Sequence, residues 1–137
     1  MVRLTHALIV DDEAHVRTYL KLILRDLGFT ECREAAEATT ALAMVQAQPP
    51  ELILLDVNMP GANGLELLHE LSEFFPDVPV VIVTSQTLVG TVQKAAELGA
   101  AGYLAKFSPK EDIIRSLSDI IAALGDDPEE TSDAGGI

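Results

Sequence analysis

Residues 51–64 read ELILLDVNMPGANG and place Asp56 directly after the apolar run Leu52 to Leu55. A short apolar run without alternation is typical of a strand that is buried on both faces of a parallel sheet. Three other runs share this character: Ala7 to Val10, Val80 to Val83 and Ala100 to Ala105. A weaker candidate, Thr30 to Ala35, mixes polar and apolar residues and is predicted to be an edge strand.

Between these runs, apolar residues recur at intervals of three and four, which predicts helices packed by one face. The apolar stripes begin at Val16, Ala38, Leu65, Leu88 and Ile113. Gly28 and Gly99 follow two of the stripes, where helices often end on a left-handed residue. Five strand-then-helix units require right-handed crossovers and a parallel sheet with helices on both faces. We therefore predict an α/β, flavodoxin-like (βα)5 doubly wound fold with five parallel strands in the order 2-1-3-4-5.

The 137 residues fit one domain, which we place at residues 1–124. Residues 125–137 lack any apolar period and are predicted to form an acidic disordered tail. The chain carries a net charge of −13, and a strong negative charge remains without the tail, so direct nucleic-acid binding is not expected. No apolar stretch is long enough for a membrane span or a signal peptide. The single Cys32 fits a reducing compartment, and we expect a cytoplasmic protein.

Polar side chains follow four of the predicted strands. They are Asp11 and Asp12 after the first strand, Asp56 after the third, Thr84 and Ser85 after the fourth, and Lys106 after the fifth. In open α/β sheets, functional groups gather at the carboxyl ends of the strands, where the strand order reverses. These side chains are therefore expected to meet at one edge of the sheet.

Each of these residues also has an ordinary structural explanation when it is taken alone. Asp11, Asp12 and Glu13 can cap the helix that follows them, and Thr84 and Ser85 can do the same for a later helix. Asp56 can form a turn before the Met-Pro pair, and most lysines are simply solvated. Together, however, three carboxylates at adjacent strand ends repel one another unless a cation lies among them.

Oxygen ligands without a histidine or thiolate pattern favour a hard cation, and Mg²⁺ binds one or two carboxylates while it keeps water that a phosphate can replace. A carboxylate in such a site can act as a nucleophile toward a phosphoryl group. Lys106 can supply positive charge to the phosphoryl oxygens, and Thr84 can supply a hydroxyl donor. The residues thus predict one acceptor carboxylate and two that hold the metal.

The chain resembles the receiver domains of bacterial two-component response regulators from residue 4 to about residue 124. The matching stretches are LIVDDEAHVR, LILLDVNMPGANGLELL, VVIVTSQ and GAAGYLAK, in the order that the family has. The resemblance implies that Asp56 is the phosphoacceptor, and that Asp11, Asp12, Asp56 and the backbone carbonyl of Asn58 bind Mg²⁺. It implies that Thr84 is the switch hydroxyl and that Lys106 pairs with the phosphoryl group. Tyr103 resembles the aromatic residue that moves with the switch, and its alternative role is that of a core-rim residue with a wet hydroxyl.

The resemblance also implies partners and a mechanism. The phosphoryl donor is expected to be a histidine kinase or a histidine phosphotransfer protein, and the receiver of the signal a downstream protein target or an output domain. Phosphorylation is expected to bias the surface formed by the fourth helix, the fifth strand and the fifth helix. A phosphorylation-dependent homodimer is compatible with this surface. The chain is not expected to be a multi-turnover enzyme, because it catalyses only its own phosphorylation and dephosphorylation.

One position departs from the family pattern, because Phe107 follows Lys106 where proline is common. A cis bond before a residue other than proline costs about 2.5 to 4 kcal/mol, so the Lys106–Phe107 bond should be trans or visibly strained.

Three alternative functions fit the sequence less well. A haloacid-dehalogenase-like hydrolase would need an aspartate where Asn58 stands, and a flavin carrier would need a glycine-rich loop where the first acidic pair stands. A receiver that docks partners without phosphorylation is the remaining alternative, although such a module would not need Asp11, Asp12, Asp56, Thr84 and Lys106 together.

Overall fold

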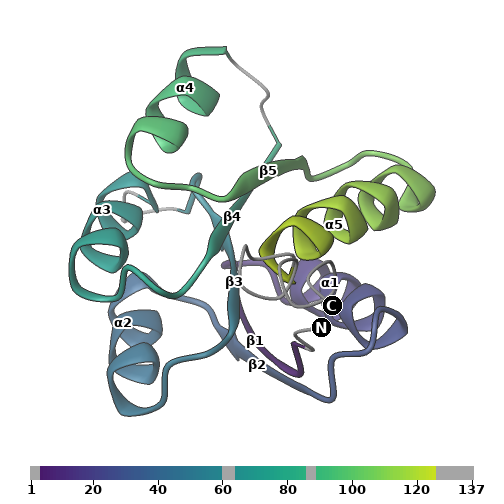
Figure 1. The fold of residues 1–137 in the computed structure, drawn as a ribbon, viewed down its shortest axis with the longest axis horizontal. Helices are drawn as coiled ribbons and strands as arrows, with labels where there is room; N and C mark the ends of the chain where they lie inside the picture. Colours follow the sequence, from purple (N-terminus) through teal and green to yellow (C-terminus); the bar gives the residue numbers. More distant parts are fainter. Residues whose placement is uncertain (1–3, 60–63, 86–88, 126–137) are drawn as a thin grey trace, which may run out of the picture.

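The computed structural model describes residues 4–59, 64–85 and 89–125, and it has the predicted alternation of strands and helices (Figure 1). The elements in chain order are β1 (His6–Val10), α1 (Ala14–Asp26), β2 (Glu31–Ala35), α2 (Ala38–Ala47), β3 (Leu52–Asp56), α3 (Gly64–Phe74), β4 (Val80–Thr84), α4 (Val89–Glu97), β5 (Gly102–Ala105) and α5 (Lys110–Gly125). The strands form one five-stranded sheet in the order β2-β1-β3-β4-β5. All four strand pairs are parallel. The predicted fold class and strand order are confirmed.

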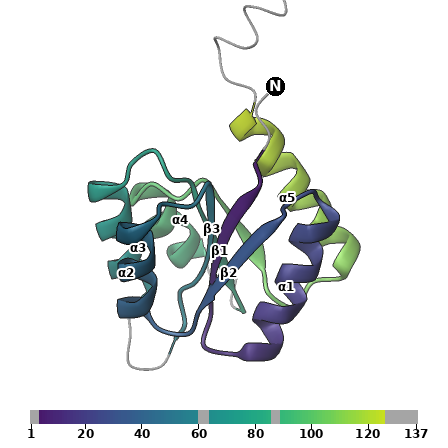
Figure 2. The ribbon, with the colours of Figure 1, turned by 90° about the horizontal axis from the view of Figure 1, so that it is seen from below.

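The sheet lies between two layers of helices. Figure 2 shows α2, α3 and α4 on one face of the sheet and α1 and α5 on the other. Alternate side chains of the central strands point to the two layers, so that Ile53 and Leu55 pack with α2, α3 and α4, whereas Leu52 and Leu54 pack with α1 and α5. Because both faces of β3 are covered, a continuous apolar run is the pattern that this strand requires.

Two glycines end helices as predicted. Gly28 has a φ of 107° after α1, and Gly99 has a φ of 100° after α4, a conformation that side chains with a Cβ rarely adopt. The fifth strand is shorter than predicted, since it begins at Gly102 rather than at Ala100. Ala100 and Ala101 instead form the connection between Gly99 and the sheet, where the Ala101 N–H donates to the Val80 carbonyl at 2.7 Å.

The C-terminal boundary of the domain differs slightly from the predicted one. Helix α5 includes Gly125, so the regular structure extends one residue past the predicted boundary at residue 124. The rest of the predicted acidic tail, residues 126–137, and the start of the fourth apolar stripe at Leu88 lie outside the described residues. Within the described part of the chain, no helix is both long enough and apolar enough to cross a membrane.

Candidate functional site

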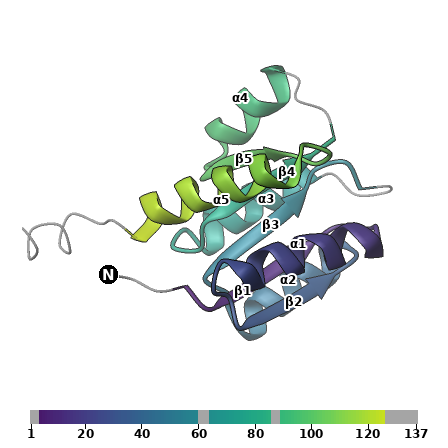
Figure 3. The same cartoon turned by 90° about the vertical axis from the view of Figure 1, so that its right-hand side faces the viewer.

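The predicted side chains meet at the carboxyl edge of the sheet. Figure 3 shows the arrows of β2 and β3 pointing toward the same edge. Asp11 follows the last residue of β1, Asp56 ends β3, Thr84 ends β4, and Lys106 follows the last residue of β5. Because β1, β3, β4 and β5 are consecutive neighbours in the sheet, parallel pairing alone brings these four positions together.

Lys106 is at the centre of the site. Its Nζ donates hydrogen bonds to Asp56 Oδ2 at 3.0 Å and to Glu13 Oε1 at 3.1 Å. It also forms an ion pair with Asp11 Oδ2 at 3.1 Å. The side chains of Asp11 and Asp56 are each 1% exposed and that of Lys106 is 5% exposed, so all three charges are withdrawn from water. The ordinary reading of Lys106 as a solvated lysine is therefore wrong.

The local backbone holds the two buried carboxylates in place. Asp11 Oδ1 accepts a hydrogen bond from the Glu13 N–H at 2.8 Å, and Asp56 Oδ1 accepts one from the Asn58 N–H at 2.9 Å. In both cases the carboxylate bonds the backbone two residues further on, as aspartates that begin turns commonly do. Each aspartate thus has one oxygen anchored by its own loop and the other directed at Lys106.

The three aspartates form an acidic cluster. One carboxylate oxygen from each of Asp11, Asp12 and Asp56 lies within 4.8 Å of the other two, and Asp12 is the exposed member. The buried Asp11 Oδ2 lies near Lys106 but has no hydrogen-bond partner among the described residues. A buried oxygen with unused acceptor capacity, beside two other carboxylates, is the kind of donor set that a hard cation such as Mg²⁺ takes.

The electrostatics of the site follow from burial and from the excess of acids. Burial raises the pKa of Asp11, and the charge of Asp56 adds to this rise, although the Glu13 N–H and Lys106 oppose it. Burial alone would lower the pKa of Lys106. Its contacts with the carboxylates of Asp56, Asp11 and Glu13 have the larger combined effect, so the pKa of Lys106 lies above its ordinary value. Lys106 is therefore charged at neutral pH.

Thr84 is fully buried and lies beside the acidic cluster. Its Oγ1 accepts a hydrogen bond from Asn58 Nδ2 at 3.0 Å, which joins the loop after β3 to the end of β4. Its backbone carbonyl accepts a hydrogen bond from the Lys106 N–H at 2.8 Å and so fixes the start of the loop that carries this lysine. No peptide bond among the described residues is cis, so the Lys106–Phe107 bond is trans, one of the two predicted outcomes.

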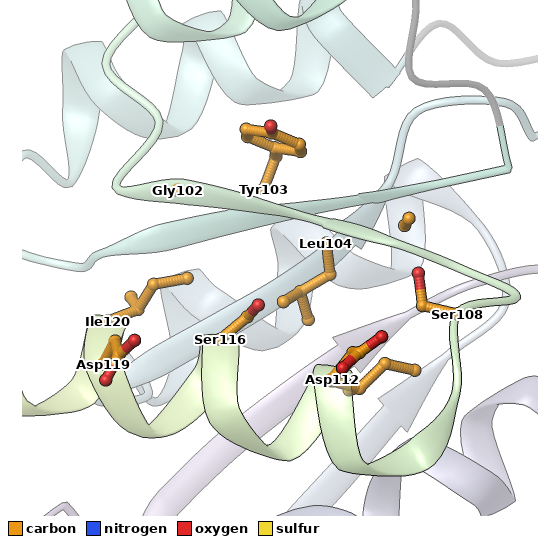
Figure 4. Close-up of a pocket in the computed structure, with 10 residues that line it drawn as sticks. Gly102, Tyr103, Leu104, Ser108, Asp112, Ser116, Asp119 and Ile120 are labelled. Atoms are coloured by element: carbon orange, nitrogen blue, oxygen red, sulfur yellow. The ribbon is translucent and has the colours of Figure 1, made fainter.

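Tyr103 lies on β5 at some remove from the acidic cluster, next to a pocket of about 420 Å³ between β5 and α5. In Figure 4 the Tyr103 ring projects from β5 on the side away from α5, whereas Leu104 points toward α5. Tyr103 is 49% exposed, and Phe107 in the following loop is 73% exposed. The conformational role of Tyr103 stays a prediction, but its ring is not packed in the core.

Two contacts at the site were not predicted from the sequence. Glu13 was interpreted as a possible helix cap, yet its side chain makes no cap hydrogen bond at the start of α1 and instead contacts Lys106. Arg17 donates from Nη1 to the Asp11 carbonyl at 2.7 Å and from Nε to Glu34 Oε1 at 3.0 Å. Its side chain therefore links the loop after β1 to β2. Glutamate is uncommon at helix caps, which was the available signal for Glu13.

Comparison with known proteins gives a consistent result. A family model described as the response regulator receiver domain matches residues 7–118. The chain is 40% identical over 101 residues to the chemotaxis protein CheY of Pseudomonas aeruginosa, covering 72% of this chain and 82% of that protein. It is 36% identical over 134 residues to the phosphate regulon transcriptional regulatory protein PhoB of the same species, covering 95% of this chain but 58% of PhoB.

The fold is also similar to that of solved structures. The structure of the chemotaxis response regulator CheY4 of Vibrio cholerae superposes with a TM-score of 0.77 at 28% sequence identity, and the match covers 86% of this chain and 99% of CheY4.

Proposed function

The chain belongs to the response regulator receiver domain family, and from this premise we propose that it is a phosphorylation-dependent signalling switch with Asp56 as the phosphoacceptor. The observation that carries the proposal is the buried Asp56 carboxylate, which lies 3.0 Å from the Lys106 ammonium and within 4.8 Å of the Asp11 and Asp12 oxygens. Such a group is positioned for chemistry rather than for solvation, since burying two carboxylates with one lysine is costly for stability.

The resident cation in this proposal is Mg²⁺. Oxygens of Asp11, Asp12 and Asp56, together with the backbone carbonyl of Asn58, would hold it, and the unbonded Asp11 Oδ2 supports this assignment. When bound, Mg²⁺ would neutralise negative charge on the carboxylates and on the phosphoryl oxygens.

The reaction is the transfer of a phosphoryl group to Asp56 from a phosphohistidine of a kinase or of a phosphotransfer protein. A carboxylate oxygen of Asp56 attacks phosphorus, a P–O bond forms, and the P–N bond of the donor breaks. The electron pair of that bond stays on the imidazole nitrogen, which is protonated from solvent. A carboxylate oxygen attacks phosphorus with its own lone pair, so the step needs no separate general base. The Asn58 N–H and Lys106 keep the carboxylate aimed while the donor approaches.

The conformational step follows from the new charge. A phosphoryl group adds negative charge and acceptor oxygens at Asp56, and it attracts donors within reach. Lys106 is already in contact with Asp56, and Thr84 would exchange its hydrogen bond from Asn58 for one to the phosphoryl group. Because Thr84 ends β4 and its carbonyl holds the Lys106 N–H, movement of Thr84 would be transmitted to the start of α4 and to the loop after β5.

The output of the switch is proposed to be a changed surface formed by α4, β5 and α5, where a downstream protein, an output domain or a second copy of the chain would bind. Tyr103 and Phe107 expose aromatic surface here, and Tyr103 also lines the pocket between β5 and α5. The chain would act as a cytoplasmic signalling module, and its only catalysis would be its own phosphorylation and dephosphorylation.

Phosphorylation of the purified chain tests the proposal against a docking module that needs no phosphate. The chain is incubated with phosphoramidate and either Mg²⁺ or EDTA, and its intact mass is measured. We expect one added phosphoryl group on the wild type with Mg²⁺, and none with EDTA or on Asp56→Asn. Absence of the modification from the wild type with Mg²⁺ would favour the docking module.

A further inference from the structure

Glu13 occupies the N-cap position of α1 but does not act as a cap. Its backbone is extended, and its side chain makes no hydrogen bond to the first turn of the helix. Side chains preferred at this position, such as Ser, Thr, Asp and Asn, satisfy free N–H groups of the first turn. The Glu13 carboxylate instead accepts a hydrogen bond at 3.1 Å from Lys106, a residue 93 positions away in the chain. The side chain therefore belongs to the charge cluster that Lys106 forms with Asp11, Glu13 and Asp56.

Three carboxylates already surround the Lys106 ammonium group. An ammonium group has three N–H donors, and three carboxylates, from Asp56, Asp11 and Glu13, lie within 3.1 Å of Nζ. A phosphoryl group on Asp56 would bring several new acceptor oxygens to the same place. One existing contact of Lys106 must then weaken.

Exposure indicates which contact is the easiest to give up. The side chain of Glu13 is 43% exposed, whereas those of Asp11 and Asp56 are each 1% exposed. Glu13 can turn into solvent and recover hydration, while a buried aspartate that loses its cation cannot. Glu13 is therefore the contact that a phosphoryl group would replace.

We propose that Glu13 is a positioning residue that competes with the phosphoryl group for the Lys106 ammonium and so restrains phosphorylation of Asp56. This inference rests on the proposed function and adds a brake to it. In the unmodified state Glu13 helps to hold Lys106 beside Asp56. During transfer its negative charge opposes the approach of an anionic donor and draws Lys106 away from the phosphoryl oxygens.

The size of the effect follows from the distances. Glu13 Oε1 and Asp56 Oδ2 lie 3.1 Å and 3.0 Å from the same nitrogen, so the two carboxylate oxygens are no more than about 6 Å apart. At that separation, removing one unit charge from a largely hydrated pair changes a rate constant by about threefold to tenfold. Glu13→Gln keeps the shape and an acceptor oxygen for Lys106, so it isolates the charge.

The test compares the phosphorylation rates of wild type and Glu13→Gln at fixed Mg²⁺, with acetyl phosphate and with the less negatively charged phosphoramidate. We expect Glu13→Gln to be faster by about threefold to tenfold with acetyl phosphate and by a smaller factor with phosphoramidate. The acceleration should shrink as the ionic strength rises, because salt screens the partly exposed Glu13 charge. A merely structural role for Glu13 would produce neither the difference between donors nor the salt dependence.

Glu37 provides a matched control. It is also a glutamate at an N-cap position, at the start of α2, with an extended backbone and no side-chain cap hydrogen bond. It is exposed, and it makes no hydrogen bond or ion pair with the charge cluster formed by the described residues. Glu37→Gln should leave the phosphorylation rates with both donors unchanged.

A second measurement detects the Glu13–Lys106 contact without phosphorylation. In a double-mutant cycle of urea unfolding, Glu13→Gln should lower stability more, or raise it less, when Lys106 is present than in the Lys106→Met background. Additive effects would overturn the inference. So would a Glu13→Gln variant that is phosphorylated no faster than wild type, and that result would leave the proposed function intact. A wild type that accepts no phosphoryl group from either donor would overturn both.

Discussion

Replacing Asp12 by asparagine should stabilise the protein without metal and destabilise it, relative to wild type, with metal. Asp12 is the exposed member of the acidic cluster, and one of its oxygens lies within 4.8 Å of oxygens of Asp11 and Asp56. The side chains of Asp11 and Asp56 contact Lys106, but Asp12 forms no ion pair with a base among the described residues. Without a cation, its charge therefore acts mainly to repel two neighbours.

The magnitude follows from Coulomb's law. Two unit charges 4.8 Å apart repel by about 0.9 kcal/mol in water, so two such neighbours contribute about 1.7 kcal/mol. Attraction to Lys106 offsets roughly one of these, which leaves a gain of about 1 kcal/mol for Asp12→Asn at low ionic strength. For a chain of this length the gain corresponds to a rise in Tm of about 4 °C.

Urea unfolding followed by far-ultraviolet circular dichroism measures both arms, since the chain has no tryptophan. In EDTA and low salt at pH 7, Asp12→Asn should unfold at a higher urea concentration than wild type. With free Mg²⁺ about ten times above its Kd, wild type should gain about 1.4 kcal/mol, and the variant should gain much less because it has lost a ligand. The order of stability should then reverse.

Asp119→Asn is the control, because it removes the same charge from an exposed position on α5, outside the acidic cluster. It should change neither the stability in EDTA nor the gain from Mg²⁺ by more than a few tenths of a kcal/mol. An Asp12→Asn variant that is less stable than wild type in EDTA, or that gains as much from Mg²⁺, would refute the account of the acidic cluster.

Two further predictions concern the support of the site and the opposite edge of the sheet. Gly64→Ala should destabilise the protein by about 1 to 3 kcal/mol and slow phosphorylation, because a Cβ there would lie 2.7 Å from the Asp56 carbonyl oxygen. Gly90→Ala is the control, since a Cβ at that position would meet open space, and it should change neither property. Urea unfolding and phosphorylation assays measure the two effects. Hydrogen bonds from the Thr5 N–H, the His6 N–H and the Thr5 hydroxyl lower the pKa of Glu51. The ionised form of Glu51 therefore stabilises the fold above the ordinary pKa of 4.5. This contribution is lost as pH falls through the lower pKa of the folded state. Glu51→Ala should cost about 1 kcal/mol at pH 7, and the difference from wild type should be smaller at pH 3; an equal cost at both values would contradict the assignment.

The fold could be predicted from the sequence because its signals are local. The apolar run at Leu52 to Leu55 reflects a strand covered on both faces, and the glycines at 28 and 99 mark helix ends that need a positive φ. The parallel topology then brings Asp11, Asp56, Thr84 and Lys106 to one edge without any further information. The early start predicted for β5 failed because alanine is apolar enough to extend a run but is equally suited to a connection.

The individual contacts within the site could not be predicted in the same way. The Glu13 side chain reaches Lys106 only because the end of β1 and the loop after β5 converge in space, and nothing near Glu13 in the sequence indicates this. The hydrogen bond between Asn58 and Thr84 likewise depends on the rotamer of one side chain in a loop. Residue type and strand position define which groups gather at the edge, whereas their pairing depends on tertiary geometry.

The central claim is that Asp56 accepts a phosphoryl group in a reaction that needs a divalent cation. Reduction of the phosphorylated chain with borohydride converts an acyl phosphate to an alcohol, and so marks the modified aspartate as homoserine for peptide mass spectrometry. We predict homoserine at position 56 after incubation with phosphoramidate and Mg²⁺, and unmodified aspartate there after incubation with EDTA. Homoserine at position 11 or 12 in place of 56, or equal conversion at 56 in EDTA, would contradict the account.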